Sequence, residues 1–241
     1  MIIQLEYGSI ELNIPSGVHP IFDSSIHLAN IIDIMPGDRV LDLGCGSGIL
    51  SIAAAKKGAD LIISTDIDEE AIKTTMSNAS LNGCSHKITT LRGSWYGPLK
   101  DTVHEKGNIK FDVIMATPPQ TPGPYDFGPR YGGPDGIRHF LPIIEGAPLF
   151  LDPVRGRLWL IAISLVDMAA IMGLLKKRFQ VVSVVDKTKR PFTPQEYEKM
   201  GNGLFEYLSI QHSRGRCEFA MDESGHYYFM TLYIRASGII L

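Results

Sequence analysis

Small and acidic residues gather where a buried strand meets a helix near the start of the chain. The stretch VLDLGCGSG, which runs from Val40 to Gly48, begins with the apolar residues of a predicted strand. Glycines at alternate positions let the backbone turn tightly and approach a ligand without interference from a Cβ atom. The helix that follows would point its amino terminus at that ligand. The pattern predicts a nucleotide-binding turn that contains Asp42, Gly44 and Gly46.

A second motif, STDIDEE, ends the next apolar run and supplies a carboxylate. Asp66 lies where an acidic side chain can accept hydrogen bonds from both hydroxyls of a ribose. Ile67 beside it is suited to pack on an adenine face. Asp68 and Glu69 are better explained as residues of a helix amino terminus, where the helix dipole favours negative charge. Because no lysine follows the glycines, a phosphate-binding P-loop is disfavoured.

A third motif, FDVIMATPPQ, ends a buried run on two prolines, residues that fix φ and cannot donate to a sheet ladder. Together the three motifs resemble those of class I S-adenosylmethionine-dependent methyltransferases. Their order and spacing are similar to the amino-methyltransferases with an Asn/Asp-Pro-Pro-aromatic motif, and within these to the HemK-like group. That group methylates the glutamine side chain of translation release factors.

Four further stretches, PIFDSSIHL, SNASLNG, GSWYGPL and RYGGPDGIRHF, resemble other elements of the HemK-like group. The resemblance implies S-adenosyl-L-methionine as the cofactor. The residues it assigns to cofactor binding are Pro20, Ser24, Asp42, Gly44, Cys45, Gly46, Gly48, Asp66, Ile67, Ser94, Trp95 and Thr117.

The prolines would form a rigid wall beyond the carboxyl end of a strand, where open α/β sheets bind their ligands. Their carbonyls would accept hydrogen bonds from an amine or amide and align its nitrogen for in-line displacement. Thr117, Pro118, Pro119 and Gln120 are therefore the predicted catalytic residues. Where the group has Asn or Asp first and an aromatic residue fourth, this chain has Thr117 and Gln120. Ser94 replaces an acid that would meet the adenine amine.

Aromatic residues in two long segments without strand–helix rhythm are candidates for an acceptor pocket. They are Tyr125 and Tyr131, in a Pro- and Gly-rich loop after the prolines, and Tyr197 and Phe205, in a segment from 187 to 226. Segments of this size in a compact domain are usually functional. We expect one short helix, TPQEYEKMG, in the second segment. The scattered His19, His27 and His139 read as structural or solvent-facing residues.

Strand and helix patterns alternate from Val40 to about Asp186, after a predicted hairpin and helix in residues 1–35. The helix SSIHLANIIDIM has serines available as caps and Pro36-Gly37 as its stop. Alternation of this kind predicts an α/β, doubly wound, mostly parallel sheet. The resemblance adds a Rossmann-like sheet of seven strands with an antiparallel last strand. We expect one methyltransferase domain over 1–241, with 187–226 as an insertion that covers the substrate.

The composition fits a cytoplasmic globular protein. With 241 residues, 44% of them hydrophobic, the chain can bury one sizeable core. No signal peptide or membrane span is evident, and we expect no membrane partner. Cys45, Cys84 and Cys217 are too widely spaced to suggest a disulfide framework or a metal site.

The leading functional hypothesis is transfer of a methyl group to an amide or amine nitrogen of a small molecule or of a peptide or protein side chain. Methylation of an exocyclic amine in RNA or DNA is a less favoured alternative, since the net charge is −3. A third reading is a module that binds S-adenosylmethionine without catalysis, which the altered Thr-Pro-Pro-Gln motif keeps open.

Overall fold

The computed structural model describes residues 1–99 and 109–240. The strands in this part of the chain are β1 (Ile2–Leu5), β2 (Gly8–Glu11), β3 (Arg39–Leu43), β4 (Leu61–Asp66), β5 (Ile88–Arg92), β6 (Val113–Ala116), β7 (Arg157–Ile163), β8 (Phe179–Phe192), β9 (Ala220–Met221) and β10 (Tyr227–Ile239). The main sheet has the order β5-β4-β3-β6-β7-β10-β8. Pairs from β5 to β7 are parallel, and β10 is antiparallel to both β7 and β8. The predicted α/β fold class and the antiparallel last strand are confirmed. Within the described residues the sheet has eight strands, one more than predicted, because the short β9 also pairs with β10.

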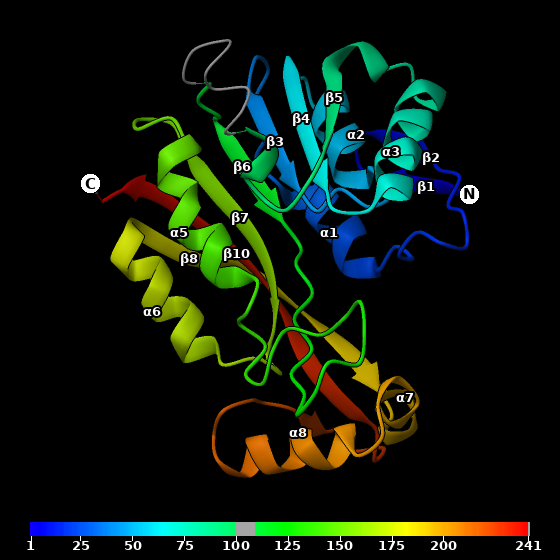
Figure 1. Ribbon diagram of the computed structural model, residues 1–241, viewed down its shortest axis with the longest axis vertical. Helices are drawn as coiled ribbons and strands as arrows, with labels where there is room; N and C mark the ends of the chain where they lie inside the picture. The colour runs from blue at the N-terminus through cyan, green and yellow to red at the C-terminus, as the bar shows by residue number, and fades with distance from the viewer. Residues whose placement is uncertain (100–108, 241) are drawn as a thin grey trace.

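Helices cover both faces of this sheet. They are α1 (Asp23–Ile31), α2 (Ile49–Lys56), α3 (Glu69–Leu81), α5 (Phe140–Phe150) and α6 (Met168–Arg178). Two further helices, α7 (Pro194–Met200) and α8 (Leu204–Ser213), follow β8. In Figure 1, α5 and α6 lie on one side of the sheet, and α1, α2 and α3 lie on the other with the β1–β2 hairpin. Among the described residues, no helix is both long and apolar enough to cross a bilayer.

Two hydrophobic cores lie back to back on the central strands. Leu41 and Leu43 of β3 belong to the core under α5 and α6, whereas Val40 belongs to the core under α1 and α2. β6 divides in the same way, since Ile114 faces the first core and Val113 the second. Side chains alternate between the two faces of a strand, so strands covered on both sides read as continuous apolar runs. This explains the unbroken hydrophobic stretches in the sequence.

The N-terminal helix differs from the predicted one at both ends. Its N-cap is Phe22, which makes no side-chain cap bond, so the serines do not cap it. The helix ends at Ile31, five residues before Pro36, because Ile32 is already extended. The ammonium group of Lys57 donates to the carbonyls of Asn30 and Ile32, at 2.6 and 2.7 Å, and so satisfies groups that a helix end leaves free.

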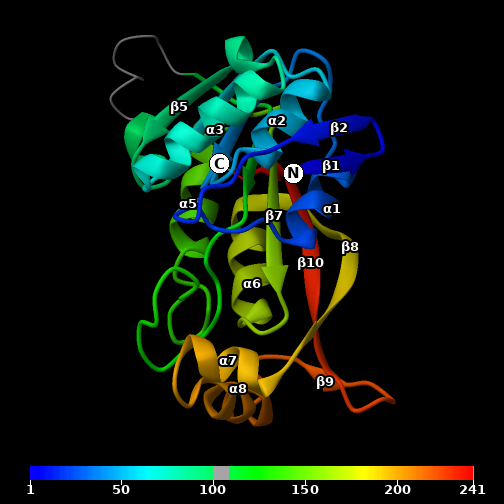
Figure 2. The ribbon, with the colours of Figure 1, turned by 90° about the vertical axis from the view of Figure 1, so that its right-hand side faces the viewer.

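The segment from 187 to 226 is more ordered than the sequence suggested. β8 continues through Phe192 and pairs with β10 as a long ribbon, which carries α7, α8 and β9 beyond the sheet (Figure 2). The predicted short helix is α7, whereas α8 was missed. The polar stretch from Lys187 to Arg190 reads as loop because a two-stranded ribbon exposes most of its side chains and needs no apolar alternation.

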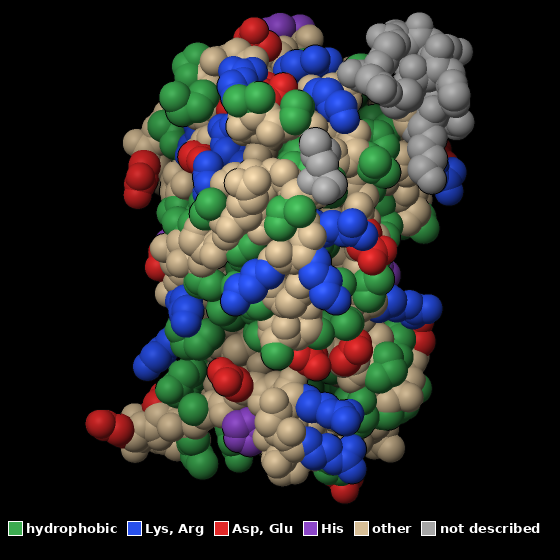
Figure 3. Space-filling model, turned by 90° about the vertical axis from the view of Figure 1, so that its left-hand side faces the viewer, with side chains coloured by type: hydrophobic (Ala, Val, Ile, Leu, Met, Phe, Trp, Pro, Cys, Tyr) green, Lys and Arg blue, Asp and Glu red, His purple; other side chains and the backbone are tan. Residues whose placement is uncertain are grey.

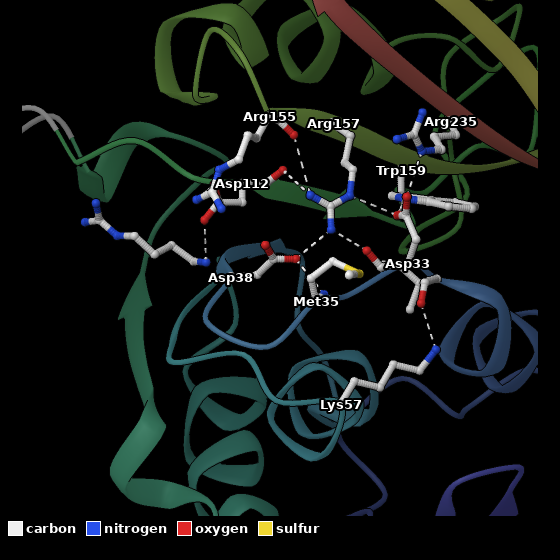
Figure 4. Close-up of polar contacts among 11 residues, drawn as sticks. Asp33, Met35, Asp38, Lys57, Asp112, Arg155, Arg157, Trp159 and Arg235 are labelled. Carbon is white, nitrogen blue, oxygen red and sulfur yellow. Dashed lines mark hydrogen bonds and ion pairs between the residues drawn. The ribbon is translucent and has the colours of Figure 1, made fainter.

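A charged network lies at the amino-terminal ends of the parallel strands, called here the amino-terminal edge of the sheet (Figure 4). Arg157 of β7, whose side chain is 7% exposed, pairs with Asp38 at 2.6 Å and with Asp33 at 3.0 Å. The Asp33 carboxylate also accepts from Trp159 Nε1 at 2.6 Å and from Arg235 Nε at 2.9 Å. The segment between α1 and β3 is thereby tied to β7 and β10.

Candidate functional site

The glycine turn between β3 and α2 is hydrogen-bonded to the neighbouring strand β4. The backbone amides of Gly44 and Cys45 both donate to the carbonyl of Thr65, at 2.8 and 3.0 Å. Gly46 and Gly48 have φ values of 52° and 83°, in the left-handed region that glycine tolerates best. A Cβ atom on Gly48 would lie 3.1 Å from the Cα of Thr75, so α3 requires a glycine there.

Gly46 differs from Gly48 because the space beside it is open. Apart from Gly46 itself and its two chain neighbours, no described residue has an atom within 4 Å of the position where the Cβ would be. Its amide donates to Asp66 Oδ2 at 3.0 Å, and Asp66 Oδ1 accepts from the amide of Asp68 at 3.0 Å. Each carboxylate oxygen has more than one acceptor position, so Asp66 can still bind a hydroxyl. Ile67, next to it, is 71% exposed, an open apolar side chain at the same edge.

Asp42 lies beneath the turn as a buried carboxyl group. Its Oδ2 accepts from the hydroxyl of Ser51 at 2.5 Å, and the same hydroxyl lies 2.8 Å from that of Ser64. Burial raises the pKa of Asp42 to about 7; the Ser51 hydrogen bond opposes this rise, and the nearby Asp66 charge adds to it. Cys45 is buried too, and its sulfur accepts from Thr75 at 3.2 Å; burial raises the pKa of this thiol, which stays neutral.

Trp95 lies three residues after the carboxyl end of β5, close to the glycine turn. Its backbone has a φ of 47°, the one positive value outside glycine in the described chain. Its indole lies close to Gly44, whose Cβ would be 3.8 Å from it. His139, just before α5, packs on the indole at 5.5 Å between ring centroids, and burial lowers the pKa of its imidazole. His139 is thus a site candidate that sequence reasoning set aside. Ser94 is exposed.

The two prolines end β6 as predicted, and Gln120 completes the sheet beyond them. Ala116 pairs with Leu160 of β7, so the register sets Pro118 opposite Ala162. Proline has no N–H for that ladder. The Gln120 carboxamide takes its place: Nε2 donates to the carbonyl of Ile161 at 3.1 Å, and Oε1 accepts from the amide of Ile163 at 2.7 Å.

The Pro118 carbonyl already accepts one hydrogen bond, which Gln120 Nε2 donates at 3.2 Å, so one of its two acceptor positions is left for a ligand. Thr117, by contrast, is half-buried, and its hydroxyl has no hydrogen-bond partner within residues 1–99 and 109–240. A half-buried hydroxyl with free capacity at the end of β6 is the polar group of the motif best placed to meet a ligand.

The aromatic candidates separate into two groups. Tyr125 is 44% exposed, with its hydroxyl bound to the carbonyl of Asn202 at 2.7 Å, and Tyr131 packs edge-on against Phe127 at 5.3 Å. Tyr197 is buried and packs edge-on against a core phenylalanine, so it faces the core in this structure and not an open pocket. Phe205 belongs to the same aromatic cluster.

Of the predicted cofactor-binding residues, Pro20 precedes α1 and Ser24 lies at its start. Pro20 is exposed and borders a hollow beside the loop that follows Gln120. Ser24 is half-buried in the first turn of α1, and no hydrogen bond joins either residue to the turn. The structure therefore brings together the turn, Asp66, Ile67 and Trp95, whereas no hydrogen bond among the described residues connects Pro20 or Ser24 to them.

The residues present fit S-adenosylmethionine. The open space beside Gly46 admits a ligand backbone, Asp66 offers acceptors for hydroxyl groups, and Ile67 and Trp95 offer apolar surfaces for a ring. Among the described residues, no group of three or more His, Cys, Asp or Glu side chains could hold a metal ion.

Comparison with known proteins points in the same direction. Residues 3–117 match the family model described as ribosomal protein L11 methyltransferase (PrmA). A putative protein N5-glutamine methyltransferase from Methanocaldococcus jannaschii is 36% identical over 122 residues, 51% of this chain and 56% of that protein. The ribosomal protein L11 methyltransferase of Oceanobacillus iheyensis is 46% identical over 116 residues, 48% of this chain and 34% of that protein. The matched part of the chain thus spans 56% of the length of the first of these curated relatives and 34% of the second.

The similarity of folds extends over the whole chain. The crystal structure of a putative methyltransferase complexed with S-adenosylhomocysteine superposes with a TM-score of 0.62 and covers 98% of this chain and 56% of the other. At 17% identity, this match speaks for the fold alone. The whole chain thus has the Rossmann-like fold of solved methyltransferase structures, and its N-terminal half is similar in sequence to protein methyltransferases.

Proposed function

We propose that this protein transfers the methyl group of S-adenosylmethionine to an amide or amine nitrogen, with a peptide or protein side chain as the first candidate acceptor. The observation that carries the proposal is the juxtaposition at one sheet edge. The open glycine turn with Asp66 ends β3 and β4, and the free Thr117 hydroxyl ends the adjacent β6. When bound, the cofactor supplies an activated methyl group on a sulfonium, so the protein needs no strong base.

The chain's own residues would act by binding and orientation. Gly44 and Gly46 would leave room for the amino-acid part of the cofactor, and Asp66 would accept from its ribose. Thr117 would orient the acceptor nitrogen, while Gln120 holds the proline wall against β7. Positioning of this kind is worth about 7–11 kcal/mol in favourable intramolecular reactions.

Both relatives described above carry names of protein methyltransferases, one for glutamine and one for ribosomal protein L11. Their names support a polypeptide acceptor for this chain. The likeness to the HemK-like group supports a glutamine amide in particular, although Thr117 and Gln120 depart from that group's motif. On the face drawn in Figure 3, Lys and Arg side chains lie in separate groups with acidic side chains between them. This face lacks the continuous basic stripe that a nucleic acid would need.

A binding module without catalysis is the second candidate. It is favoured by one observation, the hydrogen bond that Gln120 donates to the Pro118 carbonyl, the predicted partner of the substrate nitrogen. In such a module, Gln120 would hold the acceptor position permanently.

Calorimetric titration with S-adenosylhomocysteine, followed by incubation of the protein with methyl-labelled S-adenosylmethionine and fractionated cell extract, tests both candidates. Binding together with label in the protein fraction is the expected result. Binding without any labelled product would favour the module. An absence of binding would refute both.

A further inference from the structure

A small hollow opens beside the proline wall. It has a volume of about 270 Å³ and lies between the segment before α1, the loop after Gln120 and the end of α7. The residues that line it are His19, Pro20, Phe127, Pro129, Arg130 and Met200. Most of these are apolar or aromatic, and pockets of a few hundred Å³ suit a side chain or a small molecule.

Arg130 is the residue of this hollow whose charge is not balanced. Its guanidinium lies 5.0 Å from the ring centroid of Phe22, and Nη1 donates to the sulfur of Met200 at 3.4 Å. Within residues 1–99 and 109–240 it meets no carboxylate. A guanidinium has five N–H donors and stays charged, so most of its hydrogen-bonding capacity is free.

Arg190 provides an internal comparison. It also packs on Phe22, at 4.9 Å from the ring centroid, but its Nη2 pairs with Glu196 at 3.1 Å. Two guanidinium groups therefore share one aromatic ring, and only one of them has an acidic partner. The local excess of positive charge lies on Arg130, at the hollow.

The hollow is connected to the predicted catalytic motif through the backbone. The amide of Thr121, the residue after Gln120, donates to the carbonyl of Arg130 at 2.9 Å. Thr121 also forms a β-bridge with Tyr131. The position of Arg130 is thus fixed relative to the end of the proline wall, so a group bound there would lie at a set distance from the acceptor nitrogen.

We propose that this hollow binds a carboxylate of a polypeptide acceptor, from an Asp or Glu near the methylated side chain. The Arg130 fork pairs with the carboxylate, and the apolar lining packs on the methylene stem of the same residue. A single guanidinium in an apolar lining suits one negative charge better than a phosphate, which carries up to two charges and three acceptor oxygens. Only the statement that the occupant is a methyl acceptor rests on the proposed function; the binding of a carboxylate in the hollow does not.

The test begins with the hollow itself. Ligand-detected NMR titrations of the full chain, without cofactor, would compare 3-phenylpropionate with its amide and with phenylethyl phosphate. We expect the acid to bind about tenfold or more tightly than the amide, since charge-assisted hydrogen bonds are the stronger ones. Arg130→Gln should remove this preference. Arg138→Gln should keep it, because Arg138 lies on the same loop but near its own carboxylate, Asp126, at 4.0 Å. Equal melting temperatures for the variants would show that they fold.

A second arm tests the occupant with two peptides, Gly-Glu-Gln-Glu-Gly and Gly-Gln-Gln-Gln-Gly, in the presence of S-adenosylhomocysteine. Tighter binding of the acidic peptide, lost in Arg130→Gln, supports the proposal. Equal binding of acid and amide, a preference that survives Arg130→Gln, tighter binding of the phosphate, or equal binding of the two peptides would each overturn it. A protein that binds the acid but not S-adenosylhomocysteine would refute the proposed function and leave the anion site standing. The reverse result would refute the site alone.

Discussion

Polar groups at the two ends of the parallel strands differ in how far their hydrogen-bonding capacity is satisfied. At the amino-terminal edge, Arg157 donates to the carboxylates of Asp33 and Asp38 and to the carbonyl oxygens of Asp33 and Asp112. At the carboxyl-terminal edge, the Thr117 hydroxyl is unpartnered within the described residues, and open space borders Gly46. Buried polar groups that satisfy one another hold a fold together, whereas groups with free capacity can bind a ligand. The same strands therefore provide stability at one end and a candidate site at the other.

The largest effect is expected at the amino-terminal edge. Arg157→Ala would leave Asp38, a buried side chain, without its cation, and should lower the free energy of unfolding by about 3–5 kcal/mol. Urea denaturation measures this loss. Arg92→Ala is the control, since Arg92 pairs with Glu69 at 3.1 Å while both side chains are more than half exposed, and it should cost much less. Equal losses in the two variants would contradict a network that depends on burial.

A pH-dependent effect is expected from Asp42, the buried acid under the open turn. Its pKa rises from 3.8 to about 7 on folding, so the folded state binds more protons than the unfolded state between these values. Stability should be greatest below pH 4 as far as this group is concerned, and should fall as the pH rises towards 7. Asp42→Asn should remove this pH dependence. The total change in stability due to Asp42 is at most about 4 kcal/mol, at 1.4 kcal/mol per unit of pKa shift. Unfolding by urea at pH 4.5, 6 and 8 measures it, and parallel curves for the two proteins would refute the buried acid.

Asp66 should affect binding far more than stability. Asp66→Ala removes the carboxylate that accepts from Gly46 and that is predicted to bind ribose. We expect affinity for S-adenosylhomocysteine to fall about 10- to 100-fold, the equivalent of one strong charge-assisted pair. Calorimetry measures the affinity, with Asp60→Ala in the loop before β4 as a control. A large loss of stability with unchanged affinity would assign Asp66 to the scaffold.

The smallest effect is expected for Gln120. Gln120→Leu would leave the Ile161 carbonyl and the Ile163 amide without a partner, at a cost of about 1–2 kcal/mol in stability. It would also remove the hydrogen bond that the Pro118 carbonyl accepts from Gln120. If Gln120 holds the wall for catalysis, methyl transfer should fall while S-adenosylhomocysteine still binds. If it blocks the acceptor position instead, transfer should rise, and the assay described above distinguishes the two.

Much of the site could be anticipated from local sequence. Alternate glycines need particular φ values at particular positions, and an acid after a strand must lie at the sheet edge, so Gly46 and Asp66 were placed correctly. The prolines were also placed correctly at the end of β6. The neighbourhood of Trp95 was only half predicted, since its indole is near the turn but its partner His139 is 44 residues away in the sequence and carries no local signal.

Boundaries were less predictable where the environment decides the structure. The capping of α1 by Lys57 and the extension of β8 into a ribbon depend on elements distant in the chain. Tyr197 looked like an open aromatic residue, but the ribbon and α7 bury it.

The sequence by itself determined the α/β class, the strands that the motifs follow and the chemical character of the glycine turn. Periodicity and backbone restrictions act over a few residues, so a local pattern is enough to reveal them. Only the tertiary structure decided that Gln120 replaces the missing ladder bonds, that Arg157 meets Asp33 across 124 positions, and that Arg130 lacks a carboxylate among the described residues. Each of these depends on the register between strands and loops far apart in sequence, and no local pattern encodes such a register.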